Sequence, residues 1–167
     1  MLKKKKKAEK FSQKNFNFAH LLLFTSKSIL KILFLMIKTR TQNNSEQVFD
    51  PIRKKWVALT EEEKVRQFFI LYLMNELKIP ISHISIERKI TVNGLTKRYD
   101  IVVYKDTKPW MVVECKAPHI PLTQEVLEQV GRYNQTLQAE IIGVTNGAEM
   151  RFFRIDFESG KIIPIYL

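Results

Sequence analysis

The chain has 167 residues, of which 45% are hydrophobic and 27% charged, which excludes a disordered chain and suffices for one domain with a single core. Its single cysteine excludes an internal disulfide framework and is typical of the cytoplasm, where we expect the protein. The net charge of +11 is no evidence that the folded part binds nucleic acid, because residues 1–40 hold 11 Lys or Arg and one acid, whereas residues 41–167 hold 17 basic and 16 acidic residues.

The first 48 residues are predicted to be a basic, apolar tail followed by a polar linker. Lys27 and Lys31 interrupt the apolar stretch HLLLFTSKSILKILFLMIK. Three interpretations stay open: translation that begins only at Met36, a basic helix on a membrane surface, or a signal or span weakened by its lysines. Membrane contact is expected only if this tail is made. The stretch TQNNSEQ, residues 41–47, is typical of a linker, so the folded domain is predicted over residues 49–167.

The domain is predicted to open with a helix over residues 61–77. Thr60 and Glu63 form the capping-box pattern of a helix start. Residues 83–92 then alternate apolar and polar side chains, as a half-buried strand does, and an Asn-Gly pair predicts a hairpin turn after them.

The remaining pattern predicts an α/β domain with a mixed central β-sheet flanked by α-helices. Residues 97–104 and 110–116 are near-continuous apolar runs, typical of central strands covered on both faces. An amphipathic helix with Thr123 as its N-cap follows. Residues 140–147 predict a strand, and residues 150–167 predict a strand that closes as a hairpin.

The two apolar runs carry charged side chains on either side of the turn that joins them. If this turn centres near Thr107, Asp100 and Glu114 lie directly opposite with Cβ atoms about 4.5–5.5 Å apart, and Lys116 shares their face. Cys115 points the other way, into apolar packing. A divalent cation would neutralise the two carboxylates, and Mg²⁺ uses one or two carboxylates together with substrate phosphate. This pattern predicts phosphodiester hydrolysis; a buried salt bridge between Lys116 and a carboxylate is the structural alternative.

Asp100, Glu114 and Lys116 resemble the signature of the PD-(D/E)XK nuclease superfamily, although Tyr99 stands where that signature has proline. Five ordered segments further resemble the N-terminal nuclease domain of type I restriction enzyme R subunits: EKVRQFFILYL, KRYDIVVY, ECKAP, EQVGRYN and VTNG. The resemblance covers residues 49–167 and implies a restriction-endonuclease-like fold.

The resemblance also implies roles for individual residues. Asp100, Glu114 and the backbone carbonyl of Cys115 would hold Mg²⁺, with Mn²⁺ as an alternative, and Lys116 would be the catalytic lysine. Glu63 would complete the acidic site, with helix capping as its alternative role.

Further residues are expected to support the site or contact DNA. Gln129 and Tyr133 match a Q-x-x-x-Y motif that lies near the active site in this family, with plain core packing as the alternative for Tyr133. Lys97 and Arg98 are candidates for phosphate contacts, with an ordinary solvated surface as the alternative.

The predicted function is a Mg²⁺-dependent DNA endonuclease, and the alternative is a non-catalytic DNA- or protein-binding accessory module with the same fold. The sequence contains no G-x-x-x-x-G-K-[ST] motif, so neither ATP nor an ATP-driven translocase is expected. The expected partners are DNA and a separate specificity or motor protein.

Overall fold

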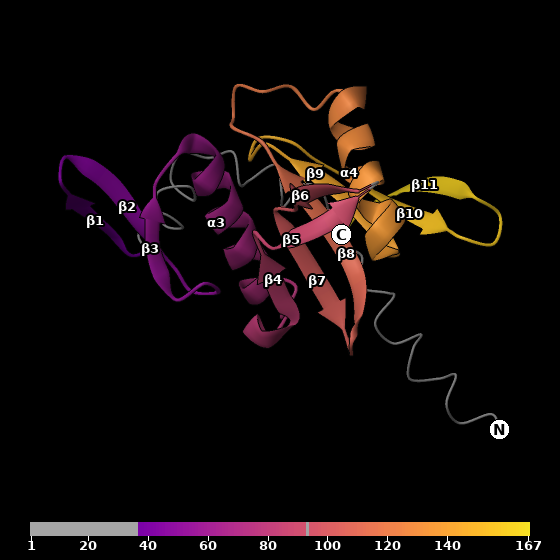
Figure 1. The fold of residues 1–167 in the computed structure, drawn as a ribbon, viewed down its shortest axis with the longest axis horizontal. Helices are drawn as coiled ribbons and strands as arrows, with labels where there is room; N and C mark the ends of the chain where they lie inside the picture. Colours follow the sequence, from indigo (N-terminus) through magenta and orange to yellow (C-terminus); the bar gives the residue numbers. More distant parts are fainter. Residues whose placement is uncertain (1–36, 93) are drawn as a thin grey trace.

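The computed structural model describes residues 37–92 and 94–167, which form a mixed sheet with helices on both faces (Figure 1). The predicted tail and the start at Met36 lie outside the described residues. Within the described part of the chain, no helix is long and apolar enough to cross a membrane. The elements in chain order are β1 (Thr39–Gln42), β2 (Ser45–Asp50), β3 (Lys55–Ala58), α3 (Glu61–Asn75), η4 (Ile81–His83), β4 (Ile84–Ile86), β5 (Lys89–Val92), β6 (Leu95–Arg98), β7 (Ile101–Lys105), β8 (Lys108–Cys115), α4 (Gln124–Leu137), β9 (Ile141–Thr145), β10 (Met150–Asp156) and β11 (Lys161–Ile165).

The main sheet has the strand order β11-β10-β9-β8-β7-β4. Strands β8 and β9 are parallel and are joined through α4, whereas the other neighbouring pairs are antiparallel. The predicted α/β class, with a mixed central sheet flanked by helices, is therefore confirmed.

Strand β7 shows why the central runs are apolar along their whole length. Ile101 and Val103 pack into the core beneath α3, whereas Val102 between them packs into the core beneath α4. All three side chains are fully buried, and each contributes roughly 1.5–3 kcal/mol to stability on transfer from water. A strand that is covered on both faces is apolar along its whole length and shows no alternation of polar residues. The sequence predicted such a strand here.

Helix α3 begins where predicted, because the Oγ1 atom of Thr60 accepts a hydrogen bond from the Glu63 N–H at 3.1 Å. It ends at Asn75, two residues before the predicted end. The predicted helix after Thr123 is also present, with Val126, Val130 and Tyr133 buried against the sheet.

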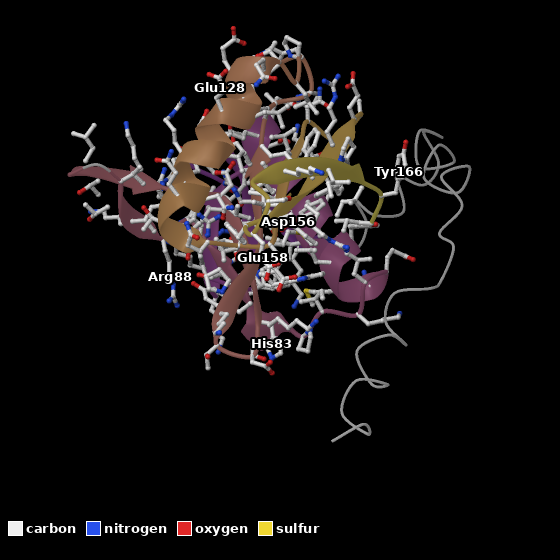
Figure 2. The ribbon with its side chains drawn as sticks, turned by 90° about the vertical axis from the view of Figure 1, so that its right-hand side faces the viewer. His83, Arg88, Glu128, Asp156, Glu158 and Tyr166 are labelled. Atoms are coloured by element: carbon white, nitrogen blue, oxygen red, sulfur yellow. The ribbon has the colours of Figure 1, made fainter. Side chains whose placement is uncertain are left out.

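The predicted continuous strand over residues 83–92 is wrong. It breaks at Glu87, whose φ of 54° lies in the left-handed region, so that β4 pairs with β7 while β5 pairs with β6 in a separate ribbon. The run over residues 97–104 breaks likewise, between Arg98 and Ile101. The polarity pattern could not show these breaks because it continues in phase through them. The pairing of β5 with β6 confirms the predicted hairpin, and this β5–β6 ribbon projects from the body beside α4 (Figure 2).

The predicted linker over residues 41–47 is also wrong. Asn43 and Asn44 have φ angles of 50° and 56° and form a two-residue turn between β1 and β2. Strand β3 completes a three-stranded sheet before α3, so ordered structure crosses the boundary that was predicted at residue 49. Asn tolerates left-handed backbone, which makes the same polar pair suitable for a hairpin turn or for a linker.

Gly143 of β9 is expected to be essential for packing. A Cβ atom there would overlap the ring of Phe152, which is directly opposite on β10 and stacks on Phe69 with ring centroids 6.0 Å apart. We expect Gly143→Ala to lower the free energy of unfolding by about 1–3 kcal/mol in urea titrations. The control is Gly131→Ala in α4, where a Cβ meets open space and alanine should stabilise the helix by up to about 1 kcal/mol. Equal effects of the two changes would contradict this packing argument.

Candidate active site

The pairing of β7 with β8 depends on a β-bulge. Lys105 pairs with Lys108 around a two-residue turn, and a simple hairpin from there would place Asp100 opposite Val113. The register shifts between Val103 and Tyr104, so that Ile101 pairs with Val113 instead. Asp100 and Glu114 consequently occupy the next facing position. The sequence predicted this pairing from a turn centred on Thr107; the structure reaches it through a tighter turn and one extra residue in β8.

Asp100 is held by both of its carboxylate oxygens. Oδ2 accepts a hydrogen bond from the Cys115 N–H at 2.7 Å, and Oδ1 lies 2.7 Å from Nη2 of Arg66. Asp100 is only 7% exposed. The Cys115 side chain is fully buried on the α3 face, as predicted, and burial followed by the charge of Asp100 raises the pKa of its thiol. Cys115 is therefore a packed thiol whose backbone orients a carboxylate.

Glu114 is the second buried carboxylate. Its Oε1 atom accepts hydrogen bonds from Lys116 Nζ at 2.7 Å and from Gln129 Nε2 at 2.5 Å. Its Oε2 atom is buried and has no hydrogen-bond partner among the described residues. Burial and the neighbouring charge of Asp100 raise the pKa of Glu114 to about 7, even though Lys116 acts to lower it. This arrangement leaves one buried oxygen able to accept a cation.

Lys116 and the second helix complete this side of the site. Lys116 Nζ lies 3.3 Å from Gln129 Oε1, and Gln129 Nε2 lies 2.9 Å from the Tyr133 hydroxyl. Burial acts to lower the pKa of Lys116, but its hydrogen bond and charge interaction with Glu114 outweigh burial and raise that pKa. The structure therefore brings together Asp100, Glu114, Lys116, Gln129 and Tyr133, all of which the sequence singled out.

Arg66 of α3 was missed in the sequence, although it links most of the acids. Its Nη2 atom lies 2.7 Å from Asp100, 3.0 Å from Glu87 and 3.2 Å from Glu62, and its Nη1 atom contacts Glu63. Its side chain is only 5% exposed. Burial acts to lower the pKa of Arg66, but Asp100 and Glu63 outweigh it, so that this pKa is raised. The available signal was helical spacing, because Glu62 and Glu63 stand four and three residues before Arg66.

Both carboxylate oxygens of Glu63 contact cations. Its Oε1 atom accepts hydrogen bonds from Arg53 at 2.7 Å and Gln67 at 2.8 Å, while Oε2 contacts Arg66. The pKa of the neighbouring Glu62 is affected by the charged residues of the site. Burial and then the charge of Asp100 raise this pKa, whereas the charges of Arg66 and Lys116 act to lower it.

Arg98 and Lys97 lie on β6, at the edge of the site. Arg98 Nε lies 2.8 Å from Glu87 Oε2, and the Arg98 side chain is 62% exposed. Lys97 is exposed on the same strand. Glu87, another residue missed in the sequence, therefore connects the β5–β6 ribbon to Arg66 and through it to Asp100.

The charges of the site favour a bound cation. When all six carboxylates are ionised, they face four cations and the formal net charge is −2: Asp50, Glu62, Glu63, Glu87, Asp100 and Glu114 against Arg53, Arg66, Arg98 and Lys116. Within residues 37–92 and 94–167 no three His, Cys, Asp or Glu side chains form a complete metal cage. Two carboxylates suffice for Mg²⁺, however, and the buried Oε2 atom of Glu114 fits such a ligand.

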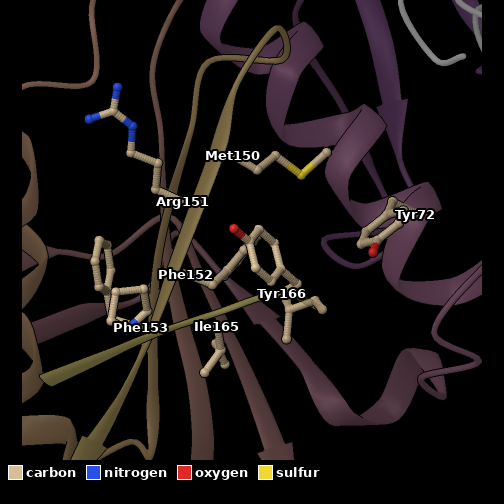
Figure 3. Close-up of a pocket in the computed structure, with 9 residues that line it drawn as sticks. Tyr72, Met150, Arg151, Phe152, Phe153, Ile165 and Tyr166 are labelled. Atoms are coloured by element: carbon tan, nitrogen blue, oxygen red, sulfur yellow. The ribbon is translucent and has the colours of Figure 1, made fainter. Parts of the chain in front are cut away.

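A hollow elsewhere on the surface plays no part in this site. It has a volume of about 230 Å³ and lies where β10 and the C-terminal residues face Tyr72 of α3 (Figure 3). Its lining includes Met150, Phe152 and Ile165 and none of the charged residues described above. This hollow is therefore separate from the acidic site at the end of β8.

The fold and the paired carboxylates define an α/β domain with a buried acidic site, and comparison with known proteins gives its family. Residues 61–166 match the model of the family described as Type I restriction enzyme R protein N terminus (HSDR_N). The chain belongs to this family, which confirms the resemblance seen in the sequence.

Two further comparisons were made. A search of curated proteins found no match. A solved structure described as a fragment of an HsdR subunit of a type I restriction enzyme from Vibrio vulnificus YJ016 is similar, with a TM-score of 0.47 and 21% sequence identity. The match covers 64% of this chain and 23% of that one, so this chain spans less than a quarter of that protein's length.

Proposed function

We propose that this chain is a Mg²⁺-dependent DNA endonuclease with a restriction-endonuclease-like fold. The observation that carries the proposal is the convergence of Asp100, Glu114 and Lys116 at the end of β8, with one buried oxygen of Glu114 unpartnered among the described residues. Membership of the restriction enzyme family supports this function, which we expect in the cytoplasm.

The residues would divide the work as follows. Asp100, Glu114 and the backbone carbonyl of Cys115 would hold Mg²⁺, or Mn²⁺ in its place. When bound, the ion would polarise the scissile phosphate and lower the pKa of a water molecule. The ammonium of Lys116 would orient the attacking water and offset phosphate charge. Gln129 bonds to both Lys116 and Glu114 and so fixes their relative position.

Two carboxylates of α3, Glu63 and Glu62, are candidates to complete the acidic site. Both oxygens of Glu63 contact cations, and Gln67 also donates to Oε1. Glu62 is partly exposed, and its pKa responds to Asp100 and Lys116. The role of Glu63 stays a prediction, and Glu62 is the alternative that the electrostatics favour.

A second candidate function is a non-catalytic DNA- or protein-binding module. The observation that favours it is Arg66, which already neutralises Asp100 without a metal ion. Lys116 pairs with Glu114 in the same way, as the structural alternative for that lysine requires. In either function, a separate specificity or motor protein is the proposed partner that brings the domain to its DNA.

The test is plasmid cleavage by the full chain in Mg²⁺ and in chelator. We expect cleavage only with the metal, and a decrease of about 100-fold in Lys116→Met because general acid–base and charge stabilisation are lost. Lys105→Met is the matched control, since Lys105 is an exposed lysine at the far end of β7 and should leave the rate unchanged. Absence of cleavage by the wild-type chain with either Mg²⁺ or Mn²⁺ would favour the binding module.

A further inference from the structure

The β5–β6 ribbon, residues 88–98, carries a cluster of positive charge. It contains Arg88, Lys89, Lys97 and Arg98, all exposed, and no acid. Residues 41–167 hold 17 basic and 16 acidic residues, so that without these four cations the remainder has a net charge of −3. The domain is therefore nearly neutral because a basic ribbon offsets the negative charge of the remainder.

The arrangement of these cations is unfavourable without an anionic partner. Lys89 and Arg98 are directly opposite in the ladder, where like charges destabilise a hairpin. Within residues 37–92 and 94–167, the one acid that forms an ion pair with Arg98 is Glu87, at the foot of the ribbon. Among the described side chains, Arg88 lies near this end and points away from the body (Figure 2). An anion that binds beside Lys89 and Arg98 would relieve the repulsion between them, whereas Lys97 pairs with Ile90 and lies on the opposite face of the ribbon.

The ribbon is attached to the body at its foot beside the acidic site and again at α4. At its foot the Glu87 N–H donates to the Asp100 carbonyl at 3.0 Å, and the Tyr99 N–H donates to the Arg88 carbonyl at 3.3 Å. Val92 packs into the core beneath α4, and Thr136 of α4 donates to the Thr91 carbonyl at 3.3 Å. A nucleic-acid backbone that reaches Asp100 therefore lies next to cations whose positions the fold has already set.

The dimensions suit duplex DNA. Four paired residues extend about 13 Å at 3.3 Å each, and one DNA strand presents a phosphate about every 3.4 Å along the helix axis, so the ribbon can reach several successive phosphates. We propose that the β5–β6 ribbon binds backbone phosphates of duplex DNA that flank the bond to be cleaved at Asp100 and Glu114. This proposal rests on DNA being the substrate of the acidic site. It adds the element that holds the duplex, with contacts that do not depend on base sequence.

Binding of a labelled duplex to the full chain in EDTA, measured by fluorescence anisotropy over a series of salt concentrations, tests the ribbon without cleavage. The double variant Lys89→Gln/Arg98→Gln removes the two cations that face each other in the ladder, and it should weaken binding by about 10-fold at low salt and reduce the slope of log K against log salt by about 2. The control Lys105→Gln/Lys108→Gln removes a pair of exposed lysines that face each other beside the β7–β8 turn and should change neither quantity. Thermal melting of the ribbon variant should change little, because removal of the Lys89–Arg98 repulsion offsets the loss of the exposed Arg98–Glu87 pair.

Each outcome decides the question. Equal losses in both double variants would mean that general basicity, and not the ribbon, binds DNA. No duplex binding by the wild-type chain, or stronger binding of a single strand or RNA of the same length, would overturn the assignment of duplex DNA. Ribbon-dependent binding combined with no cleavage in Mg²⁺ or Mn²⁺ would uphold the ribbon and reject the nuclease, so the two proposals fail separately.

Discussion

Asp100→Asn is expected to abolish metal binding and to reduce DNA cleavage by about 10⁴-fold, a barrier increase of about 5.5 kcal/mol. The carboxylate is the group that the Cys115 N–H and Arg66 together orient beside Glu114. Asparagine keeps the shape of the side chain but lacks the negative charge that a divalent cation requires. Calorimetric titration of the full chain with Mn²⁺ and Mg²⁺ measures binding, and plasmid nicking measures cleavage.

The matched control is Asp106→Asn, in the turn at the other end of the same hairpin. Asp106 is exposed and has a φ of 57°, a conformation that asparagine tolerates well. It should leave metal binding, cleavage and thermal stability unchanged. Full cleavage by Asp100→Asn, with its fold verified by circular dichroism, would refute the assignment of the active site. Metal binding in neither the wild-type chain nor the variant would favour the accessory module.

Arg66→Met is expected to lower the free energy of unfolding by about 3–5 kcal/mol, because it leaves buried carboxylates without their shared cation. Arg66 contacts Glu62, Glu63, Glu87 and Asp100. Methionine preserves much of the side-chain length and removes the charge, so the loss reports the ion network more than a cavity. Urea denaturation of the full chain, monitored by far-ultraviolet circular dichroism, measures the change.

Lys64→Met on the same helix is the control for this change. Lys64 pairs with Glu61, whose side chain is 56% exposed, and a pair near the surface contributes about 0–1 kcal/mol. If both variants lose the same stability, the Arg66 network is no stronger than an ordinary surface pair. If Arg66→Met lacks the native circular dichroism spectrum even without denaturant, the loss of unfolding free energy is larger than the total stability of the domain, which agrees with the prediction.

Local sequence determined those parts of the structure that depend on neighbouring residues. Thr60 caps α3 because its hydroxyl reaches an N–H group three residues later. The runs around Val102 and Val112 became central strands because only a strand covered on both faces is apolar throughout. The same local signals placed Asp100, Glu114 and Lys116 on one hairpin.

Tertiary structure decided the features that depend on distant partners. The bulge beside Tyr104 sets which residue faces Asp100, and a slip of one residue would have sent Glu114 to the other face. The left-handed backbone of Glu87 separates the basic ribbon from the main sheet, although the polarity pattern continues through it. Arg66 meets Asp100 across 34 positions of sequence, a distance over which no periodicity carries information. The sequence by itself therefore determined the elements and their acidic residues, whereas long-range packing decided their register and their counter-ions.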